Sequence, residues 1–474
     1  MGGVGGEETS PKARSEHIPM PKLCDLTEAA ILEYIRLETA ESIREEVNPR
    51  FPFPRMIAVG DRQSVVISEA IEKIIIASAD VLIAENNPVL SKVKLTELQK
   101  IVRTAFGEYL EDIDVSESPC GRAKEMAQTV RARVTEEIER CSRRETVFGC
   151  ALFSEPDIRS FELGPLRFEN RSDWLERKCS EGAISNVTRR RIESAWAGHR
   201  LRKRKPSNDS LFEKEIVRTI GNCRWVCTVV TVGLSTETAL ERAATAARLG
   251  LLAVALCWPR ASQALDRMRL AYDGAVYQKN VIAFGPTNAV LTKSSISGIA
   301  AGLPIKGEEW NAFVFENSDY FYIISEILGF FVGPKGDYRR ADISSALAQS
   351  LLWFHDGCQE TSDLVGVVKH SAALDALAGG NKSAGIKKLV EARLGIPPGE
   401  ELRTGGLTMG RLINEIYNEG RSRSIHGTNT RFTHDWSGIR YLAERLAESC
   451  IHACIDYVAT DPSVTDLEKL REPP

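Results

Sequence analysis

The stretch DISSALAQSLLWFHDGCQETSDLVGVVKHSAALDALAGG, residues 342–380, sets the architecture expected for the C-terminal part of the chain. Its apolar residues recur three and four positions apart, a spacing that predicts two amphipathic helices. We expect the first helix to begin at Asp342 and the second at Ser362, because both side chains can cap free backbone N–H groups. Gly379 and Gly380 are expected to end the second helix, since glycine readily adopts the left-handed conformation found at helix ends.

Three more helical segments follow, joined by short connections. They are KSAGIKKLVEARLGI (382–396), LTMGRLINEIYNEGRSRSIHG (407–427) and DWSGIRYLAERLAESCIHACIDYVA (435–459). Short loops between amphipathic helices favour antiparallel neighbours. Residues 340–460 are therefore predicted to form a C-terminal antiparallel helical bundle, with a tail at 461–474.

The chain before this bundle divides into three parts by its pattern. Residues 1–22 are rich in Gly, Pro and charge, which is typical of disorder. Residues 23–146 show helical periodicity, including the whole of SVVISEAIEKIIIASADVLIAE (64–85). Residues 147–335 mix short β-branched runs with helical segments, and the turn-rich VGPKGDYRR (332–340) is expected to be a domain boundary. The predicted fold class is α+β, mostly α, with a mixed α/β middle region that senses a signal or regulates the bundle.

Composition narrows the class of protein. The chain has 474 residues with a formal net charge of -4, so any contact with nucleic acid should use a local basic patch. Its 11 cysteines show no disulfide framework, and the N-terminus has no apolar core of signal-peptide length. No apolar run is long enough to span a bilayer. These features predict a cytoplasmic protein with no membrane association.

The segment YNEGRSRSIHG (417–427) concentrates the residues suited to chemistry. Histidine exchanges protons near neutral pH, and arginine offers a rigid fork of donors that matches phosphate oxygens. Arg421 and His426 thus suit cleavage of RNA by its own 2'-hydroxyl, without a metal. On an ideal helix the two lie about 140° apart, so they converge best if the last turn is distorted or two copies face each other. The alternative is a cationic helix end that favours the helix dipole.

This segment and the helices before it resemble the Apea-like branch of the HEPN family. The family pattern Y-x-x-R-S-x-x-x-H-G falls, in order, on the residues Tyr417, Arg421, Ser422, His426 and Gly427, with three residues instead of two between the tyrosine and the arginine. The resemblance covers roughly residues 340–460. It implies a homodimeric, metal-independent endoribonuclease without a cofactor, of a kind associated with toxins and with abortive infection against phage. Arg421 would bind the scissile phosphate and His426 would be the general base or acid.

Two positions bear on this resemblance. Many HEPN nucleases have Asn, Asp or His after the arginine, whereas this chain has Ser422, as the Apea-like branch tends to have. Gly420 stands where a bulky apolar residue is usual, and glycine costs about 1 kcal/mol in a helix interior relative to alanine. Gly420 is therefore expected to loosen or kink the site.

Several neighbouring residues are candidates for supporting roles, each with a plainer alternative. Arg423 is equally suited to RNA backbone and to solvent, and Asn418 could orient a phosphate or simply solvate the helix. His434 could supply a second proton-transfer group or cap the next helix. His355 with Asp356 could also face the cleft.

Two other groups of residues raise binding questions. Residues 189–205 hold eight basic residues and one acid, with Trp196 and His199 among them, which indicates either an RNA-recruiting patch or a solvated helix and loop. The cysteines and histidine of CRWVC (223–227) and CIHAC (450–454) lack the usual zinc-ligand spacing, and no metal site is predicted.

Together these patterns predict an RNA-cleaving C-terminal domain controlled by an unknown trigger that residues 23–335 bind. The alternative is a catalytically inactive HEPN-type module that serves as a dimerisation or nucleotide-binding scaffold.

Overall fold

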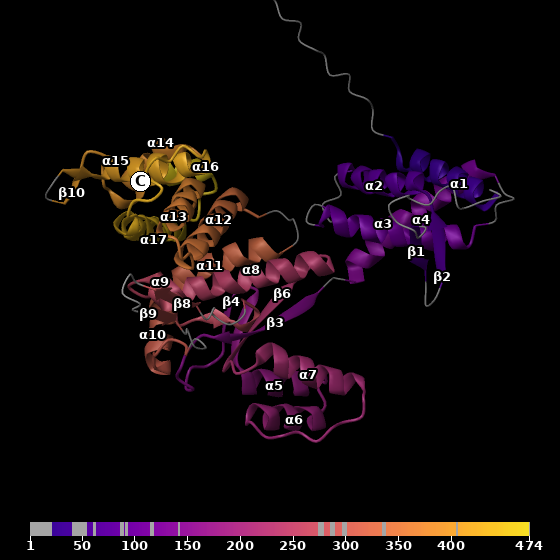
Figure 1. Cartoon of the computed structure of the whole chain (residues 1–474), viewed down its shortest axis with the longest axis horizontal. Coiled ribbons are helices and arrows are strands. Elements are labelled where there is room, and N and C mark those ends of the chain that lie inside the picture. Colours follow the sequence, from indigo (N-terminus) through magenta and orange to yellow (C-terminus); the bar gives the residue numbers. More distant parts are fainter. Residues whose placement is uncertain are drawn as a thin grey trace, which may run out of the picture. The chain divides into compact units, whose positions relative to one another are not determined.

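A computed structural model of the chain describes residues 21–39, 55–59, 63–85, 90, 93–113, 118–140, 143–273, 279–284, 290–295, 301–333, 338–403 and 406–473. The chain forms two compact units, Met1–Arg140 and Cys141–Pro474, each with its own elements (Figure 1). The disorder predicted for residues 1–22 falls, apart from residues 21 and 22, outside the described residues. The fold is α+β and mostly α.

The first unit packs four helices against a hairpin around one apolar core. Its elements are α1 (Leu23–Thr39), β1 (Arg55–Val59), β2 (Gln63–Ile67), α2 (Glu69–Ala84), α3 (Leu95–Glu111) and α4 (Pro119–Arg140). The helix predicted from Ser64 onward was wrong in its first turn, because Val65 and Ile67 alternate with more exposed neighbours as a strand does. Helix α2 begins only after Ser68, whose hydroxyl accepts a hydrogen bond from the Ile71 N–H at 3.3 Å.

The second unit is built on a five-stranded antiparallel sheet in the order β4-β5-β6-β3-β7. The strands are β3 (Arg144–Ala151), β4 (Phe161–Leu163), β5 (Leu166–Asn170), β6 (Trp225–Thr231) and β7 (Arg269–Leu270). A separate hairpin is formed by β8 (Lys279–Phe284) and β9 (Val290–Ser295). The mixed α/β region predicted for residues 147–335 thus contains an antiparallel sheet.

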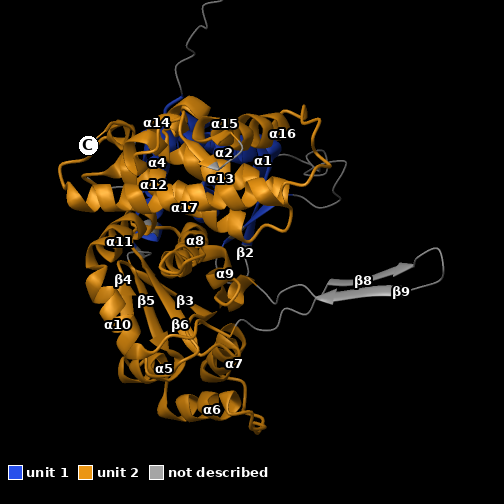
Figure 2. Ribbon diagram, turned by 90° about the vertical axis from the view of Figure 1, so that its left-hand side faces the viewer, with its two compact units in different colours: residues 1–140 blue, residues 141–474 orange. Residues whose placement is uncertain are grey.

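Helices cover both faces of this sheet (Figure 2). They are α5 (Arg171–Ser180), α6 (Asn186–Trp196) and α7 (Asn208–Ile220) on one face, and α8 (Thr236–Ala255) with α9 (Ala261–Leu265) on the other. Strand β6 is buried by both layers: Cys227 and Val229 join the larger core with α8, whereas Val226 joins a small core with Trp174 and Ile192. Successive side chains of a strand point to opposite faces, so this central strand is buried on both faces; it is mostly apolar, with Thr228 and Thr231 also buried.

The C-terminal helices form a layered bundle. After α10 (Gly307–Glu316) and α11 (Ser318–Val332) come α12 (Ala341–Cys358), α13 (Asp363–Leu377), α14 (Lys382–Leu394), the short strands β10 (Glu401–Arg403) and β11 (Leu407–Thr408), α15 (Met409–Asn414), the π-helix η4 (Glu415–Ser422), α16 (Arg423–Ile425), α17 (Ser437–Thr460) and the 3-10 turn η5 (Leu467–Arg471). Ser362 caps α13 as predicted, through a contact of its hydroxyl with the Val365 N–H at 3.5 Å. Asp342 was a wrong cap prediction: α12 begins after Arg340, and Asp342 lies in its first turn.

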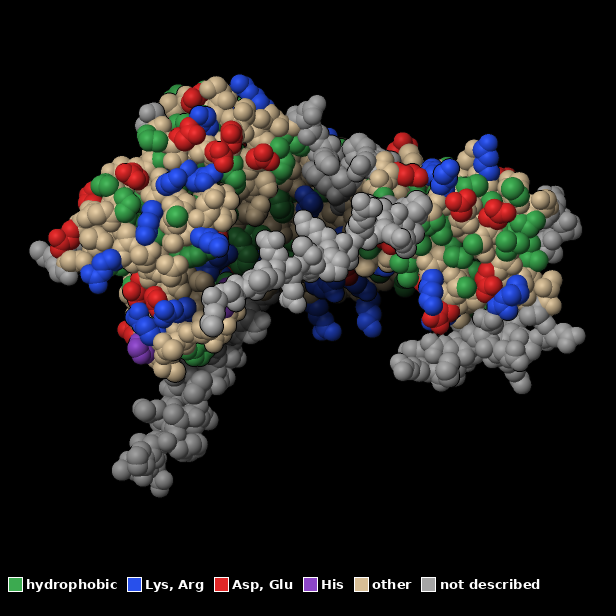
Figure 3. Space-filling view, turned by 90° about the horizontal axis from the view of Figure 1, so that it is seen from above, with side chains coloured by type: hydrophobic (Ala, Val, Ile, Leu, Met, Phe, Trp, Pro, Cys, Tyr) green, Lys and Arg blue, Asp and Glu red, His purple; other side chains and the backbone are tan. Residues whose placement is uncertain are grey.

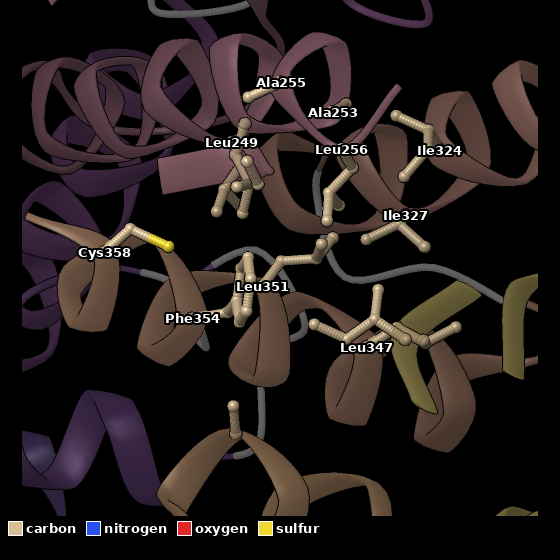
Figure 4. Packing of buried hydrophobic residues seen from close by; sticks show 14 of the residues in the cluster. Leu249, Ala253, Ala255, Leu256, Ile324, Ile327, Leu347, Leu351, Phe354 and Cys358 are labelled. Carbon is tan, nitrogen blue, oxygen red and sulfur yellow. The ribbon is translucent and has the colours of Figure 1, made fainter. Parts of the chain in front are cut away.

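The apolar core continues across the segment at which the sequence predicted a domain boundary. Leu347, Leu351 and Phe354 of α12 lie against apolar side chains of α8 and α11, among them Leu249 and Ile324 (Figure 4). All these side chains are at most 2% exposed. The sheet region and the bundle therefore fold as one compact unit around a shared core, and the bundle has no separate core of its own.

No helix within the described residues has the length and apolar character needed to cross a membrane.

Candidate functional site

The Arg421 segment departs from α-helical geometry. Residues 415–422 form a π-helix, which is followed by a single α-helical turn, α16, ending at Ile425. π-Helical turns are rare and occur often at functional sites. A distorted backbone, one of the two ways that the sequence left open for bringing Arg421 and His426 together, is thus present in this segment.

Gly420 explains how this wide turn fits against α13. A Cβ atom at Gly420 would lie 2.6 Å from Cγ1 of Val367, far inside van der Waals contact. Gly420 is buried, and Cζ3 of Trp436 would lie 3.6 Å from the same Cβ atom. The glycine therefore permits close packing of the π-helix on α13, in addition to its low helix propensity.

The Arg421 guanidinium is held at two of its nitrogens. Nη1 donates to the Tyr417 hydroxyl at 2.7 Å, and Nη2 lies 3.3 Å from Oδ2 of Asp375. Asp375 is only 7% exposed, and its Oδ1 accepts from the Lys382 N–H at 3.0 Å. Burial raises the pKa of Tyr417, so its hydroxyl keeps its proton. Because charge-assisted hydrogen bonds are short and directional, this arrangement fixes the plane of the guanidinium.

Arg421 borders an open groove of about 460 Å³ between α12 and α13. The groove is lined by Asp342, Ser345, Ala346, Gln349, Trp353, Ala372, Asp375, Ala376, Gly379, Gly380, Arg421 and Leu467. Trp353 is 42% exposed and offers an aromatic face beside these polar groups. The groove thus combines one oriented cation with an indole ring and several hydrogen-bonding side chains.

His426 lies at the end of the same segment and is exposed. Its backbone N–H bonds to the Ser422 carbonyl at 3.0 Å, and Gly427 follows with φ +70°, as the sequence predicted for the helix end. His426 is not among the residues that line the groove, and no contact between its side chain and Arg421 occurs within the described part of the chain. One chain therefore does not bring the two side chains together.

The supporting candidates lie around this turn at its surface. Asn418 and Arg423 are exposed, and Arg423 forms an ion pair with Glu419 at 2.8 Å. Ser422 is half-buried and accepts the His426 N–H through its carbonyl. His434 is exposed in the loop before α17, where its Nδ1 accepts from Arg431 at 3.4 Å. None of these four lines the Arg421 groove.

His355 and Asp356 do not line the Arg421 groove either. Nδ1 of His355 lies 3.1 Å from Oδ1 of Asp356, and both line a second cavity of about 360 Å³ with Arg248 and Asp273. The His355 hydrogen bond is the first of several causes that lower the pKa of Asp356. The two residues thus belong to a different cavity from the one the sequence suggested.

Two important residues were missed from the sequence. Asp375, the partner of Arg421, lies in an otherwise apolar helical stretch, SAALDALA, and a lone acid in such a stretch was the available signal. His370 on the same helix is fully buried, and neither ring nitrogen has a hydrogen-bond partner among the described residues. Burial, followed by the charges of Arg440 and Lys369, lowers its pKa to about 3. His370 is therefore neutral and structural.

The cysteines of residues 223–227 and 450–454, considered above as metal ligands, are buried packing groups. Cys223 and Cys227 are buried, as are Cys450 and Cys454, while Nε2 of His452 lies 3.0 Å from the Leu256 carbonyl oxygen. No set of three or more metal-ligating side chains gathers in the described ranges.

In the basic stretch 189–205, Trp196 is not available for stacking on a base. Its ring is partly buried against the small core and is covered by the Arg171 guanidinium, 4.9 Å from the ring centre.

Comparisons with known proteins matched the chain to no family model, no curated sequence and no solved structure.

Proposed function

We propose that the protein is a metal-independent endoribonuclease of HEPN type, acting as a cytoplasmic homodimer in anti-phage defence or toxin-like abortive infection. The observation that carries this proposal is the π-helical segment, in which Arg421 is oriented at an open groove while His426 stays exposed. This arrangement agrees with the resemblance of residues 340–460 to the Apea-like branch.

The proposed mechanism uses both side chains on one phosphodiester. Tyr417 and Asp375 hold the Arg421 guanidinium, which presents its remaining N–H groups to phosphate oxygens. His426 removes the proton of the RNA 2'-hydroxyl, and the 2'-oxygen attacks the neighbouring phosphorus. The bond between phosphorus and the 5'-oxygen breaks and this oxygen takes up a proton from water, leaving a 2',3'-cyclic phosphate and a 5'-hydroxyl end. Arg421 stabilises the charge that develops on the phosphoryl oxygens.

A second copy of the chain completes the site in this proposal. His426 of one chain does not border the groove of its own Arg421. A two-fold axis beside α16 would place His426 of each subunit opposite Arg421 of the other, because such an interface repeats every contact twice. The remainder of the chain, including the first unit, would bind the trigger that controls cleavage.

One observation favours a second candidate, a catalytically inactive scaffold with the same bundle. The Asp375 carboxylate already neutralises Arg421, and phosphate would have to compete with it. In that case the Arg421–Asp375 pair is only a structural link between η4 and α13.

Cleavage of a structured RNA in EDTA distinguishes the two candidates. We expect Arg421→Ala and His426→Ala to abolish cleavage, and Arg423→Ala, which removes a nearby exposed arginine, to retain it. A cyclic phosphate end on the product would identify the 2'-hydroxyl mechanism. Equal cleavage by all variants, or loss of wild-type cleavage in EDTA, would reject the nuclease.

Mixing the two inactive variants tests whether the site is shared. Random exchange of subunits puts one Arg421→Ala chain and one His426→Ala chain in half of the dimers. If each site takes Arg421 from one chain and His426 from the other, every such mixed dimer has one site with both side chains intact. The mixture should then recover about a quarter of wild-type activity. A mixture as inactive as its components would place the pair within one chain.

A further inference from the structure

The surface formed by α6, α7 and their connection is strongly basic in an acidic protein. Residues 186–218 contain ten Lys and Arg against four Asp and Glu, whereas the whole chain has a net charge of -4. The remainder of the chain is therefore more acidic than the total suggests. By contrast, acidic and basic side chains are interspersed on the face of the C-terminal helices seen in Figure 3.

Two acids on α7, the buried Glu213 and the partly exposed Asp209, fix the backbone of this connection. Arg191 donates through Nε to Glu213 at 2.7 Å and through Nη2 to the Arg202 carbonyl at 2.9 Å. Arg204 donates through Nη2 to Asp209 at 3.0 Å and through Nη1 to the Thr188 hydroxyl at 3.0 Å. Both arginines point inward, so the loop between the helices is braced at two points.

This bracing also engages Glu213 and Asp209, and the other two acids of residues 186–218, Glu193 and Glu215, lie in ion pairs with Arg189 and Arg218. Glu213 is only 6% exposed, and Asp209 accepts further hydrogen bonds from Ser185 and Thr188. Five basic side chains remain exposed and have no ion-pair partner among the described residues: Arg190, Arg200, Arg202, Lys203 and Lys205. A rigid backbone with unpaired cations loses little entropy when it binds a polyanion.

An exposed aromatic residue lies near these cations in the chain. Phe212, in the second turn of α7, is 61% exposed, and the neighbouring Leu211 is equally exposed. Cationic side chains combined with exposed rings are the recurring features of surfaces that bind single-stranded nucleic acid without sequence preference.

We propose that the α6–α7 surface binds the phosphate backbone of single-stranded RNA, with Phe212 stacking on a base. The choice of RNA over DNA rests on the proposed nuclease function, whereas binding of a polynucleotide backbone does not. The surface lies at the end of the second unit opposite the bundle (Figure 2). It would therefore hold a segment of RNA separate from the one that is cut.

The test is a salt titration of binding to a fluorescein-labelled 20-nucleotide oligouridylate, followed by anisotropy. The full-length chain carries His426→Ala, so that the probe stays intact. The test variant adds Arg202→Ala, Lys203→Ala and Lys205→Ala, and the matched control adds Arg159→Ala, Lys306→Ala and Lys388→Ala, three exposed basic residues elsewhere in the second unit. Both variants lose the same charge, so a difference between them reports position.

We expect the test variant to bind at least about tenfold more weakly and its salt slope to fall by about 2, since each phosphate contact on a single strand contributes about 0.7. The control should bind like its parent. The double variant with Arg202→Lys and Phe212→Ala keeps every positive charge, so it should lose only the stacking part of the affinity. Equal binding by test and control would overturn the proposal.

Two further probes separate the sources of negative charge. A 20-nucleotide oligothymidylate bound as tightly as RNA supports a backbone-reading surface and removes the preference for RNA. Phosphatidylserine vesicles bound through the same three residues, without binding of either oligonucleotide, would overturn the proposal in favour of a membrane surface. Because no step involves cleavage, an inactive nuclease site leaves these outcomes unchanged.

Discussion

His370 should make the stability of the second unit depend on pH. The ring is fully buried between α12 and α13, where Gly357 leaves the space for it: a Cβ at Gly357 would lie 2.6 Å from His370 Cε1. Phe354 packs on the ring, and the nearby charges are those of Arg440 and Lys369. A proton on His370 would therefore sit in an apolar site beside two cations.

The sign and size of the effect follow from its pKa of about 3 in the folded chain. An unfolded histidine has a pKa of about 6.5, so the folded state prefers the neutral ring and its stability is complete above that value. Stability falls as the pH drops from about 6.5 toward 3, by about 1.4 kcal/mol per pH unit. Between pH 7 and pH 5 the loss from His370 is therefore about 2 kcal/mol.

Urea unfolding at pH 7 and pH 5, followed by tryptophan fluorescence, measures this loss. His370→Leu removes the titrating ring. Between pH 7 and pH 5 its free energy of unfolding should therefore fall by about 2 kcal/mol less than that of the wild type. His199→Ala, which removes an exposed histidine, should keep the wild-type dependence. A His370→Leu protein with the same dependence as the wild type would refute the reasoning, whatever its stability at pH 7.

Three further substitutions test the packing around the site. Gly420→Ala should lower the free energy of unfolding by about 1–3 kcal/mol, because its Cβ would clash with Val367, and adding Val367→Ala should relieve part of that loss in a double-mutant cycle measured in urea. Asp375→Asn should lower KM for RNA cleavage because it frees Arg421 to bind phosphate, and should lower kcat because Arg421 is no longer oriented. A change in KM alone would show that Asp375 only competes with substrate. Ser362→Ala should cost about 1 kcal/mol through loss of the α13 cap, and an unchanged urea midpoint would contradict the cap.

The candidate site was only partly accessible from the sequence. The pattern of residues 417–427 located Arg421 and His426 in one segment with a distorted backbone, and the structure has a π-helix there. The partner Asp375 lies 46 residues earlier in the chain, and no local pattern pairs the two. In the proposed function Arg421 and His426 come from different chains, and such an arrangement follows from the contact between two folded chains and not from a local pattern.

Local sequence patterns predicted the elements that depend on neighbouring residues. The helices followed from apolar spacing, the start of α13 from Ser362 and its end from Gly379 and Gly380, because capping and backbone preference act within one turn. Short β-branched runs likewise placed β3 and β6.

Tertiary structure alone decided three features. Strand β2 formed where helical spacing continued, because its pairing with β1 buries alternate side chains. The sheet region and the bundle merged into one unit, because α8, α11 and α12 share a core across residues 332–340. The π-helix could rest on α13 only because Gly420 has no side chain to meet Val367. All three depend on contacts between residues distant in sequence, whose free energy outweighs the small local preferences.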